Sequence, residues 1–142
     1  MRSSSAWPSF SVYPMLASMS GATEIKVPLD DGGNHDLDAM AREITAATRL
    51  VLVCNPNNPT STALPLDRIA EFVAGVPHWL RLRWPERDTV LYPRISYPSY
   101  AMGATLAGCR AVPYATLADV DPADAARALC VWVNSPANPT GD

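Results

Sequence analysis

The stretch LVLVCNPNNPT at residues 50–60 decides the fold, because a short apolar run passes directly into a turn rich in Asn and Pro. A second stretch of the same design, LCVWVNSPANPT, spans residues 129–140. An aromatic-Pro-Ser-aromatic turn lies upstream of each, at residues 7–10 and at residues 97–100. Self-similarity of this kind marks a structural unit that is present twice.

The repeat sets the expected domain organisation. The 142 residues are enough for one domain. We therefore expect a single compact α/β domain over residues 1–142, built from two homologous segments, residues 1–75 and residues 76–142.

Composition and charge exclude several classes of protein. Hydrophobic side chains make up 48% of the chain and charged ones 18%, with a net charge of −3, which is ordinary for a globular protein. No apolar run approaches the roughly 18 residues of a membrane-spanning helix, and no basic patch suits nucleic acid. The opening MRSSSAWPSF lacks the apolar core of a signal peptide. We expect a cytoplasmic protein with no nucleic-acid or membrane partner, and with no metal site, because three Cys and two His show no ligand spacing.

Apolar periodicity predicts strands that alternate with helices. The expected strands are residues 23–28, 50–54, 89–92, 110–114 and 129–133. The expected helices are residues 10–19, 36–47, 65–75, 99–107 and 122–128, with Gly75 and Pro77 ending the third. Alternation of this kind predicts a three-layer α/β/α sandwich with a mostly parallel sheet of about five strands. The uninterrupted apolar run 50–54 is typical of a strand covered on both faces.

The phrase Asn-Pro-x-Asn-Pro-Thr after an apolar strand, with the aromatic turn upstream, resembles the large domain of fold-type I pyridoxal-phosphate (PLP) aminotransferases. Residues 6–75 look like histidinol-phosphate aminotransferases. Residues 76–142, with SYPSYAMGATLAG and VWVNSPANPTG, look like succinyldiaminopimelate aminotransferases. The residues MRSSS replace the strand that leads into the turn in these proteins, so no strand is expected there.

The resemblance implies two cofactor-binding positions in each segment. The second aromatic residue of the turn, Phe10 or Tyr100, would stack on the pyridine ring of PLP. The second Asn of the phrase, Asn58 or Asn138, would hydrogen-bond the phenolic oxygen. An aromatic face suits a flat ring, and an amide after a parallel strand faces the ligand crevice. Asn and Pro after a strand also form ordinary turns, so a vestigial or purely structural role stays open.

The groups that drive PLP chemistry have no match in this sequence. In the family that it resembles, a lysine forms a Schiff base with the cofactor, an Asp pairs with the pyridinium nitrogen and an Arg binds the substrate. The one lysine of the chain, Lys26, lies in an expected strand. We therefore expect no catalytic residues, no bound cofactor and no enzymatic activity, because PLP chemistry needs these groups together.

Three hypotheses of function follow. The first is an artificial or accidental chimera of two aminotransferase large-domain fragments that folds without catalytic activity. The second is an enzyme remnant with weak PLP or phosphate binding. The third is a self-associating interaction module, most simply a dimer, because strands without their neighbours leave unpaired edges that bind another chain.

Overall fold

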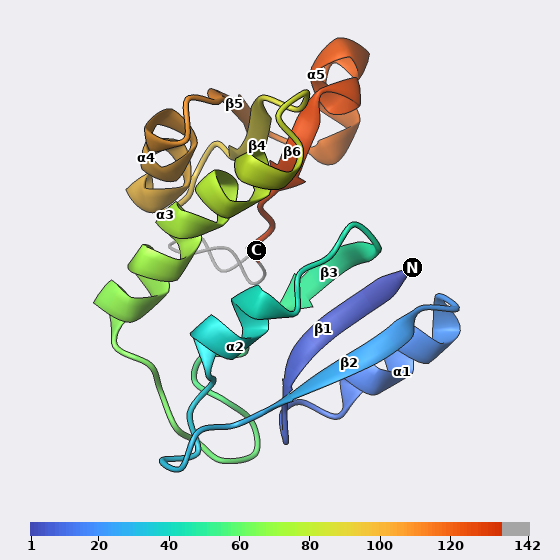
Figure 1. The fold of residues 1–142 in the computed structure, drawn as a ribbon, viewed down its shortest axis with the longest axis vertical. Coiled ribbons are helices and arrows are strands. Elements are labelled where there is room, and N and C mark those ends of the chain that lie inside the picture. The colour runs from blue at the N-terminus through green and yellow to red at the C-terminus, as the bar shows by residue number, and fades with distance from the viewer. Residues whose placement is uncertain (135–142) are drawn as a thin grey trace. The chain divides into compact units, whose positions relative to one another are not determined.

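The computed structural model describes residues 1–134, so the expected site residue Asn138 lies outside the described part (Figure 1). Residue contacts divide the chain into two compact units, Met1–Leu66 and Asp67–Asp142. Each unit holds a three-stranded parallel sheet with helices beside it. The expected α/β class with parallel strands is confirmed. The strands form two sheets of three, however, instead of one sheet of about five.

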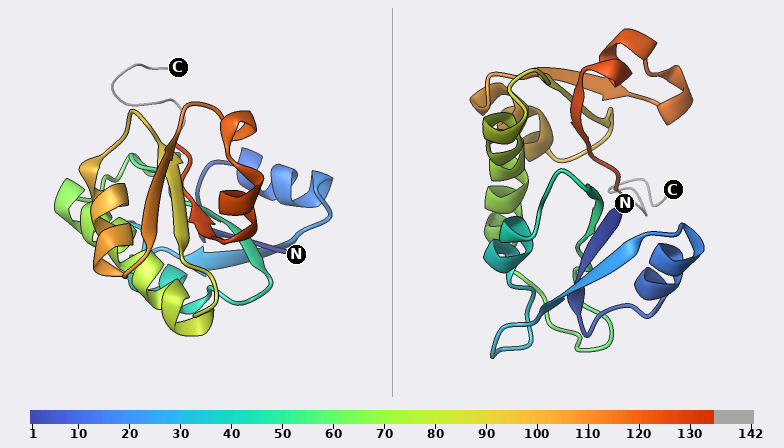
Figure 2. Two further views of the ribbon diagram at one scale, coloured as in Figure 1. Left: turned by 90° about the horizontal axis from the view of Figure 1, so that it is seen from above. Right: turned by 45° about the vertical axis from the view of Figure 1, so that its right-hand side comes forward.

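The first unit is ordered β2-β1-β3. Its strands are β1 (Arg2–Trp7), β2 (Thr23–Pro28) and β3 (Thr48–Leu52), and its helices are α1 (Val12–Met19) and α2 (Leu37–Arg42). The chain moves from the central strand to one edge and then back across to the other. Right-handed crossovers therefore place α1 and α2 on opposite faces of the sheet (Figure 2).

The expectation that MRSSS replaces a strand was wrong, because these residues begin β1, the central strand. Parallel ladders to β2 and to β3 bind it on both sides. Backbone hydrogen bonding of this kind does not depend on apolar side chains, so the absence of an apolar pattern concealed the strand. Ser4 and Ser5 are fully buried, and their hydroxyl groups have no hydrogen-bond partner. This strand therefore contributes little apolar burial to the core of its unit.

The third strand also differs from its expected position and environment. It runs over Thr48–Leu52 instead of residues 50–54. It is an edge strand with β1 as its neighbour, and Arg49 and Leu50 are exposed. The apolar run predicts a strand that is covered on both faces. Strand β3 is partly exposed instead, because it lies at the edge of the sheet.

The second unit has the same arrangement, with the order β5-β4-β6. Its strands are β4 (Thr89–Pro93), β5 (Arg110–Tyr114) and β6 (Ala128–Val131). Its helices are α3 (Leu66–Arg83), α4 (Pro98–Leu106), the short 3-10 helix η1 (Leu117–Asp119) and α5 (Pro122–Ala126). The helices α4 and α5 lie on opposite faces of the sheet (Figure 2).

Helix α3 does not end at Gly75 and Pro77, as the sequence suggested, but continues to Arg83. Pro within a helix costs about 3 kcal/mol, because its ring clashes with the preceding turn. Here Val73, Val76, Pro77 and Leu80 are all buried at helical spacing. Burial of this apolar stripe offsets the cost of the proline, so packing overrides the local signal.

The helices α3 and α4 approach each other closely at Gly103. A Cβ atom at this position would lie 2.7 Å from the Cα atom of Ala74 and 2.8 Å from its carbonyl oxygen. Both atoms belong to the backbone and cannot rotate away. A glycine at position 103 is therefore required for the two helices to pack at this distance.

We predict that Gly103→Ala lowers the free energy of unfolding by about 1–3 kcal/mol, because overpacking outweighs the gain in helix propensity. Urea unfolding followed by circular dichroism measures the change. Gly75→Ala is the matched control, because the atoms nearest to its Cβ would belong to the Trp79 ring, the first at 3.1 Å. That ring is partly exposed and can move, so the control should cost less. Equal effects of the two substitutions would contradict this account.

Candidate functional site

The aromatic turn of each segment lies at the edge of its sheet where the strands end. In the first unit, the turn at residues 7–10 follows β1, and the Asn-Pro phrase follows the neighbouring strand β3. The ends of adjacent parallel strands share one edge, which is the usual location of ligand sites in α/β proteins. This edge is therefore the candidate site of the first unit.

Asn57 is the centre of the candidate site, and its side chain is buried. Its Oδ1 accepts a hydrogen bond from Ser9 Oγ at 2.7 Å and contacts His35 Nε2 at 3.1 Å. Its Nδ2 donates to the carbonyl oxygen of Pro8 at 3.1 Å and to Thr60 Oγ1 at 2.8 Å. Every donor and acceptor of the amide is thus used within the protein. The contacts join three loops, those that follow β1, β2 and β3.

The second loop, between β2 and α2, is shaped by two aspartates. Asp30 Oδ1 accepts the backbone N–H groups of Gly32 and Asn34, at 2.9 and 2.8 Å, which closes the turn. Asp36 caps α2 by accepting the N–H of Ala39 at 2.8 Å. His35 lies immediately before this cap, so the start of the helix fixes its position beside the Asn-Pro phrase.

The surroundings of His35 favour the neutral form of its ring. Because Asn57 Nδ2 is already a donor, its Oδ1 must be the acceptor, and His35 Nε2 therefore carries the proton. Nδ1 of the ring is buried without a hydrogen-bond partner. Burial lowers the pKa of His35 below 6.5, and the contact with Asn57 opposes this in part. A proton on Nδ1 would be placed in a buried position with nothing to bind it.

The residues with expected cofactor roles in this unit, Phe10 and Asn58, lie beside the Asn57 network. Phe10 is 39% exposed and makes an edge contact with Tyr13, with ring centroids 5.8 Å apart. Asn58 is exposed, and among residues 1–134 its side chain has no hydrogen-bond partner. Their chain neighbours, Ser9 and Asn57, are hydrogen-bonded to each other. The structure thus brings the two expected residues to adjacent loops at one edge.

Tyr13 and Cys54 meet next to these loops. Burial, reinforced by the contact with Cys54, raises the pKa of Tyr13 to about 12. The thiol of Cys54 also donates to the carbonyl oxygen of Pro56, at 3.4 Å. The phenol of Tyr13 therefore stays protonated near neutral pH and is a poor general base there.

In the second unit an aromatic cluster occupies the equivalent edge. Tyr100 is buried and stacks on Trp132, with centroids 5.1 Å apart and planes within 14°. Tyr114 donates its hydroxyl to the carbonyl oxygen of Trp132 at 2.6 Å, and Tyr97 contacts Tyr100 edge-on. One face of the Tyr100 ring, the expected cofactor platform, therefore lies against Trp132.

The two edges differ because of a few sequence differences between the phrases. Trp132 stands at the position of Leu52, and Ala137 stands at the position of Asn57. The second phrase therefore cannot form the amide network of the first. The sequence reasoning missed Asn57 and His35. Ser9, Asn57 and His35 come from three separate loops, and only the burial of Asn57 in the folded chain reveals the connection.

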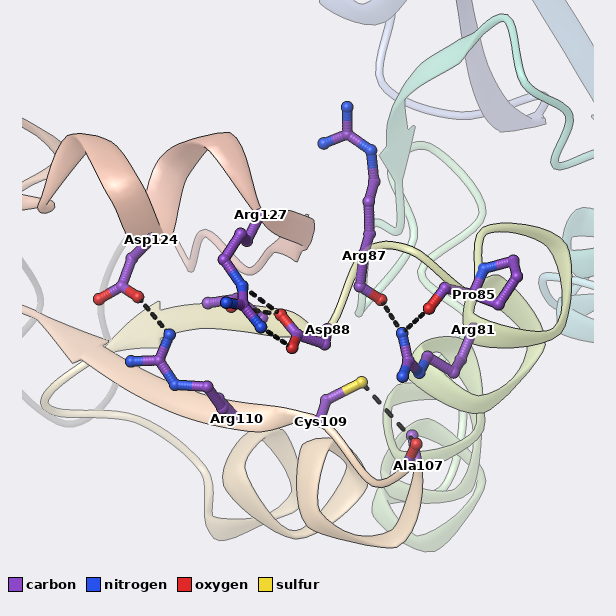
Figure 3. Close-up of polar contacts among 10 residues, drawn as sticks. Arg81, Pro85, Arg87, Asp88, Ala107, Cys109, Arg110, Asp124 and Arg127 are labelled. Atoms are coloured by element: carbon purple, nitrogen blue, oxygen red, sulfur yellow. Dashed lines mark hydrogen bonds and ion pairs between the residues drawn. The ribbon is translucent and has the colours of Figure 1, made fainter.

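A charged cluster marks the opposite end of the second sheet (Figure 3). Arg127 hydrogen-bonds both oxygens of Asp88, and this contact, the largest cause, lowers the pKa of Asp88 to about 2. Arg110 pairs with Asp124 at 2.6 Å. Arg81 donates to two backbone carbonyl groups of the turn before β4. Each charged head has an internal partner, so the cluster joins α3, α5 and the starts of the strands.

Lys26 lies away from the Asn-Pro phrase of its own unit. Its Nζ is 3.6 Å from the Glu24 carboxylate and 4.1 Å from the centroid of the Trp7 ring. It belongs to β2, which is separated from β3 by the central strand. Within residues 1–134, no three His, Cys, Asp or Glu side chains are grouped as metal ligands would be. In the same part of the chain no helix is long and apolar enough to cross a membrane.

Comparison with known proteins places these features in a family. The chain is similar to an aromatic amino acid aminotransferase of Streptomyces avermitilis, with 53% identity over 72 residues, or 51% of this chain and 20% of that protein. It is similar to a Thermobifida fusca protein of the same name, with 47% identity over 92 residues, or 63% of this chain and 25% of that protein. The chain therefore spans about a fifth to a quarter of the length of these relatives.

Among solved structures, the chain is similar to N-succinyldiaminopimelate aminotransferase from Mycobacterium tuberculosis. The identity is 30% and the TM-score is 0.46, over 53% of this chain and 21% of that one. The family model for aminotransferases of class I and II matches this sequence twice, over residues 5–80 and residues 79–142. Both segments are thus covered, and the chain belongs to the aminotransferase class I and II family.

Proposed function

We propose that this chain, taken by itself, is a folded pair of aminotransferase large-domain segments that carries out no transamination. The position of Lys26 is the observation that carries the proposal. Its ammonium group is ion-paired with Glu24 and lies over the Trp7 ring. A Schiff-base lysine must reach the carbonyl carbon of the cofactor, and no other lysine exists in the chain.

The residues present at the candidate site do not fit PLP as a catalytic cofactor. The first unit offers the exposed ring of Phe10 and the exposed amide of Asn58 at adjacent loops. The arginines of this unit lie elsewhere: Arg2 begins β1, Arg49 lies near the start of β3 and Arg42 ends α2. A phosphate group would find no cationic anchor among them at the Asn-Pro edge. Chemistry through this cofactor therefore has no support from the chain's own residues.

The double match to one family model also supports an origin by joining two fragments. We propose an artificial or accidental chimera, with residues 6–75 from a histidinol-phosphate aminotransferase-like parent and residues 76–142 from a succinyldiaminopimelate aminotransferase-like parent. The similarity to aromatic amino acid aminotransferases makes that branch a second candidate parent.

Weak noncovalent binding of PLP is the second candidate function. The exposed ring of Phe10 and the unpaired amide of Asn58 favour it, because both groups remain accessible on neighbouring loops. Stacking on an aromatic face and one amide hydrogen bond contribute only a few kcal/mol together. Binding of this kind would be weak and would form no covalent bond.

We predict no transamination of any amino acid and no imine absorbance when PLP is added. Borohydride reduction followed by mass spectrometry should find no adduct at Lys26. Lys26→Ala should behave as the unchanged protein does in each assay. Transamination that is measurable in the unchanged protein and lost in Lys26→Ala would overturn the proposal. Noncovalent binding that Asn58→Ala removes, without loss of stability, would establish the second candidate instead.

We predict that Asn57→Ala lowers the free energy of unfolding by about 2 kcal/mol or more, because it leaves Ser9 and His35 without their buried partner. Asn58→Ala is the matched control. Its side chain is exposed, so the change should stay within about 0.5 kcal/mol. Urea unfolding of both variants checks this. A larger loss for Asn58→Ala than for Asn57→Ala would show that the polar centre is assigned to the wrong residue.

The stability of the first unit should depend on His35. Because the pKa of His35 is lowered on folding, the unfolded chain binds a proton more readily. Stability should therefore be highest above pH 6.5 and should fall as the pH drops below that value toward the lowered pKa. Urea unfolding at a series of pH values measures the slope. His35→Gln should remove this part of it, whereas His78→Gln, at an exposed position, should not. An unchanged slope in His35→Gln would disprove the assignment.

A further inference from the structure

The two edges of each three-stranded sheet differ in chemistry. Strand β2 contains Pro28 and the ion pair between Glu24 and Lys26, and β5 contains Pro113 and Arg110. Proline and charged side chains are the usual means by which proteins prevent an edge strand from pairing with another chain. One edge of each sheet is therefore protected.

The opposite edges contain no proline, and β6 contains no charged side chain either. Strand β6 has the sequence ALCV, without proline or charge, and Val131 is 43% exposed. Strand β3 has the sequence TRLVL, and Leu50 is 46% exposed. The same asymmetry occurs in two units of different sequence. It therefore belongs to the shared design of the segments and is not an accident of one strand.

The single charge of β3 covers only the beginning of the strand. The Arg49 guanidinium group donates to the backbone carbonyl oxygens of Ala46 and Thr48, at 2.6 and 3.1 Å. The charge is thus drawn toward the beginning of the strand, away from Val51 and Leu52. Strand β3 has β1 as its sheet neighbour, so the backbone groups on its other side are not used within this sheet.

We propose that β3 is an interaction surface that pairs antiparallel with β3 of a second copy of this chain. A two-fold axis at Leu50 places Leu50 opposite its own copy and Arg49 opposite Val51 of the other chain. Like charges then do not face each other, and the exposed apolar side chains cover one another. The arrangement is closed, because the same edge is used on both copies. The pairing joins the β2-β1-β3 sheets of the two copies into one continuous sheet of six strands.

The small size of the edge determines the strength of the association. Five residues per copy bury less than the roughly 1,200 Å² of a standard stable interface. The dimer is therefore in equilibrium with the monomer and depends on protein concentration. Light scattering and sedimentation of the purified chain should show a mass that rises from 15.3 kDa toward twice that value as concentration increases.

Two substitutions locate the contact. Leu50→Lys places a charge at the unprotected edge and should keep the mass at 15.3 kDa at every concentration. Thr23→Lys is the matched control, because Thr23 is an exposed residue of the protected strand β2, and it should associate as the unchanged chain does. Circular dichroism confirms that both variants fold. Both altered side chains are exposed, so neither change disturbs the core.

Cross-linking gives an independent test of register. Leu50→Cys should form an interchain disulfide on mild oxidation, because the two-fold axis brings the two altered positions together. Thr23→Cys, in the same background with the native cysteines replaced by serine, should not. A constant mass of 15.3 kDa for the unchanged chain would overturn the proposal. Association that persists in Leu50→Lys, or that Thr23→Lys also removes, would overturn it as well.

Discussion

Both units depend on a central strand that pairs on both sides, β1 in the first and β4 in the second. The central strand comes first in each sheet, and the chain then builds one edge before crossing back to build the other. Right-handed crossovers force the helices that connect the strands, α1 and α2 in the first unit and α4 and α5 in the second, onto opposite faces. In the first unit, the same constraint brings the turn after the central strand and the Asn-Pro phrase after the last strand to one edge.

The two central strands meet this constraint with different side chains. In β4, Thr89, Val90 and Leu91 are buried, and apolar contact holds the helices against the sheet. In β1 the buried residues include Ser4 and Ser5, which contribute almost no apolar area and leave their hydroxyl groups unpaired. The first unit therefore relies more on polar contacts, and the Asn57 amide, which joins three loops, supplies the most extensive of these.

The sequence predicted features that depend on local chemistry or on a repeated pattern. The α/β class, the parallel strands and the helix that became α4 follow from periodicity and from Pro and Gly at its ends. Features that depend on distant residues were not predictable. Strand β1 has no apolar pattern because its two neighbours define it, and α3 passes through Pro77 because a buried stripe outweighs the break.

The residues of the candidate site also fall into those that the sequence predicted and those that it did not. Phe10, Asn58 and Tyr100 could be named from their motifs, because each occupies a fixed place relative to a strand end. Their surroundings could not be named. His35 reaches Asn57 through a loop whose path depends on the Asp30 turn and the Asp36 cap, and Trp132 lies under Tyr100 because β6 is the neighbour of β4. These positions depend on contacts between residues far apart in the sequence, so no local sequence pattern predicts them.

The surroundings also determine what the motifs can do. At the first edge, the amide with the most hydrogen bonds, Asn57, is fully used inside the protein, which leaves the exposed Asn58 as the accessible group. At the second edge, the ring of Tyr100 has already acquired an aromatic partner within the chain. Several residues at these two edges therefore already have hydrogen-bond or ring-stacking partners within the chain. A segment that stabilises its loops in this manner gains a defined fold from the family's motifs alone, because turn formation and stacking need neither a lysine nor a cofactor.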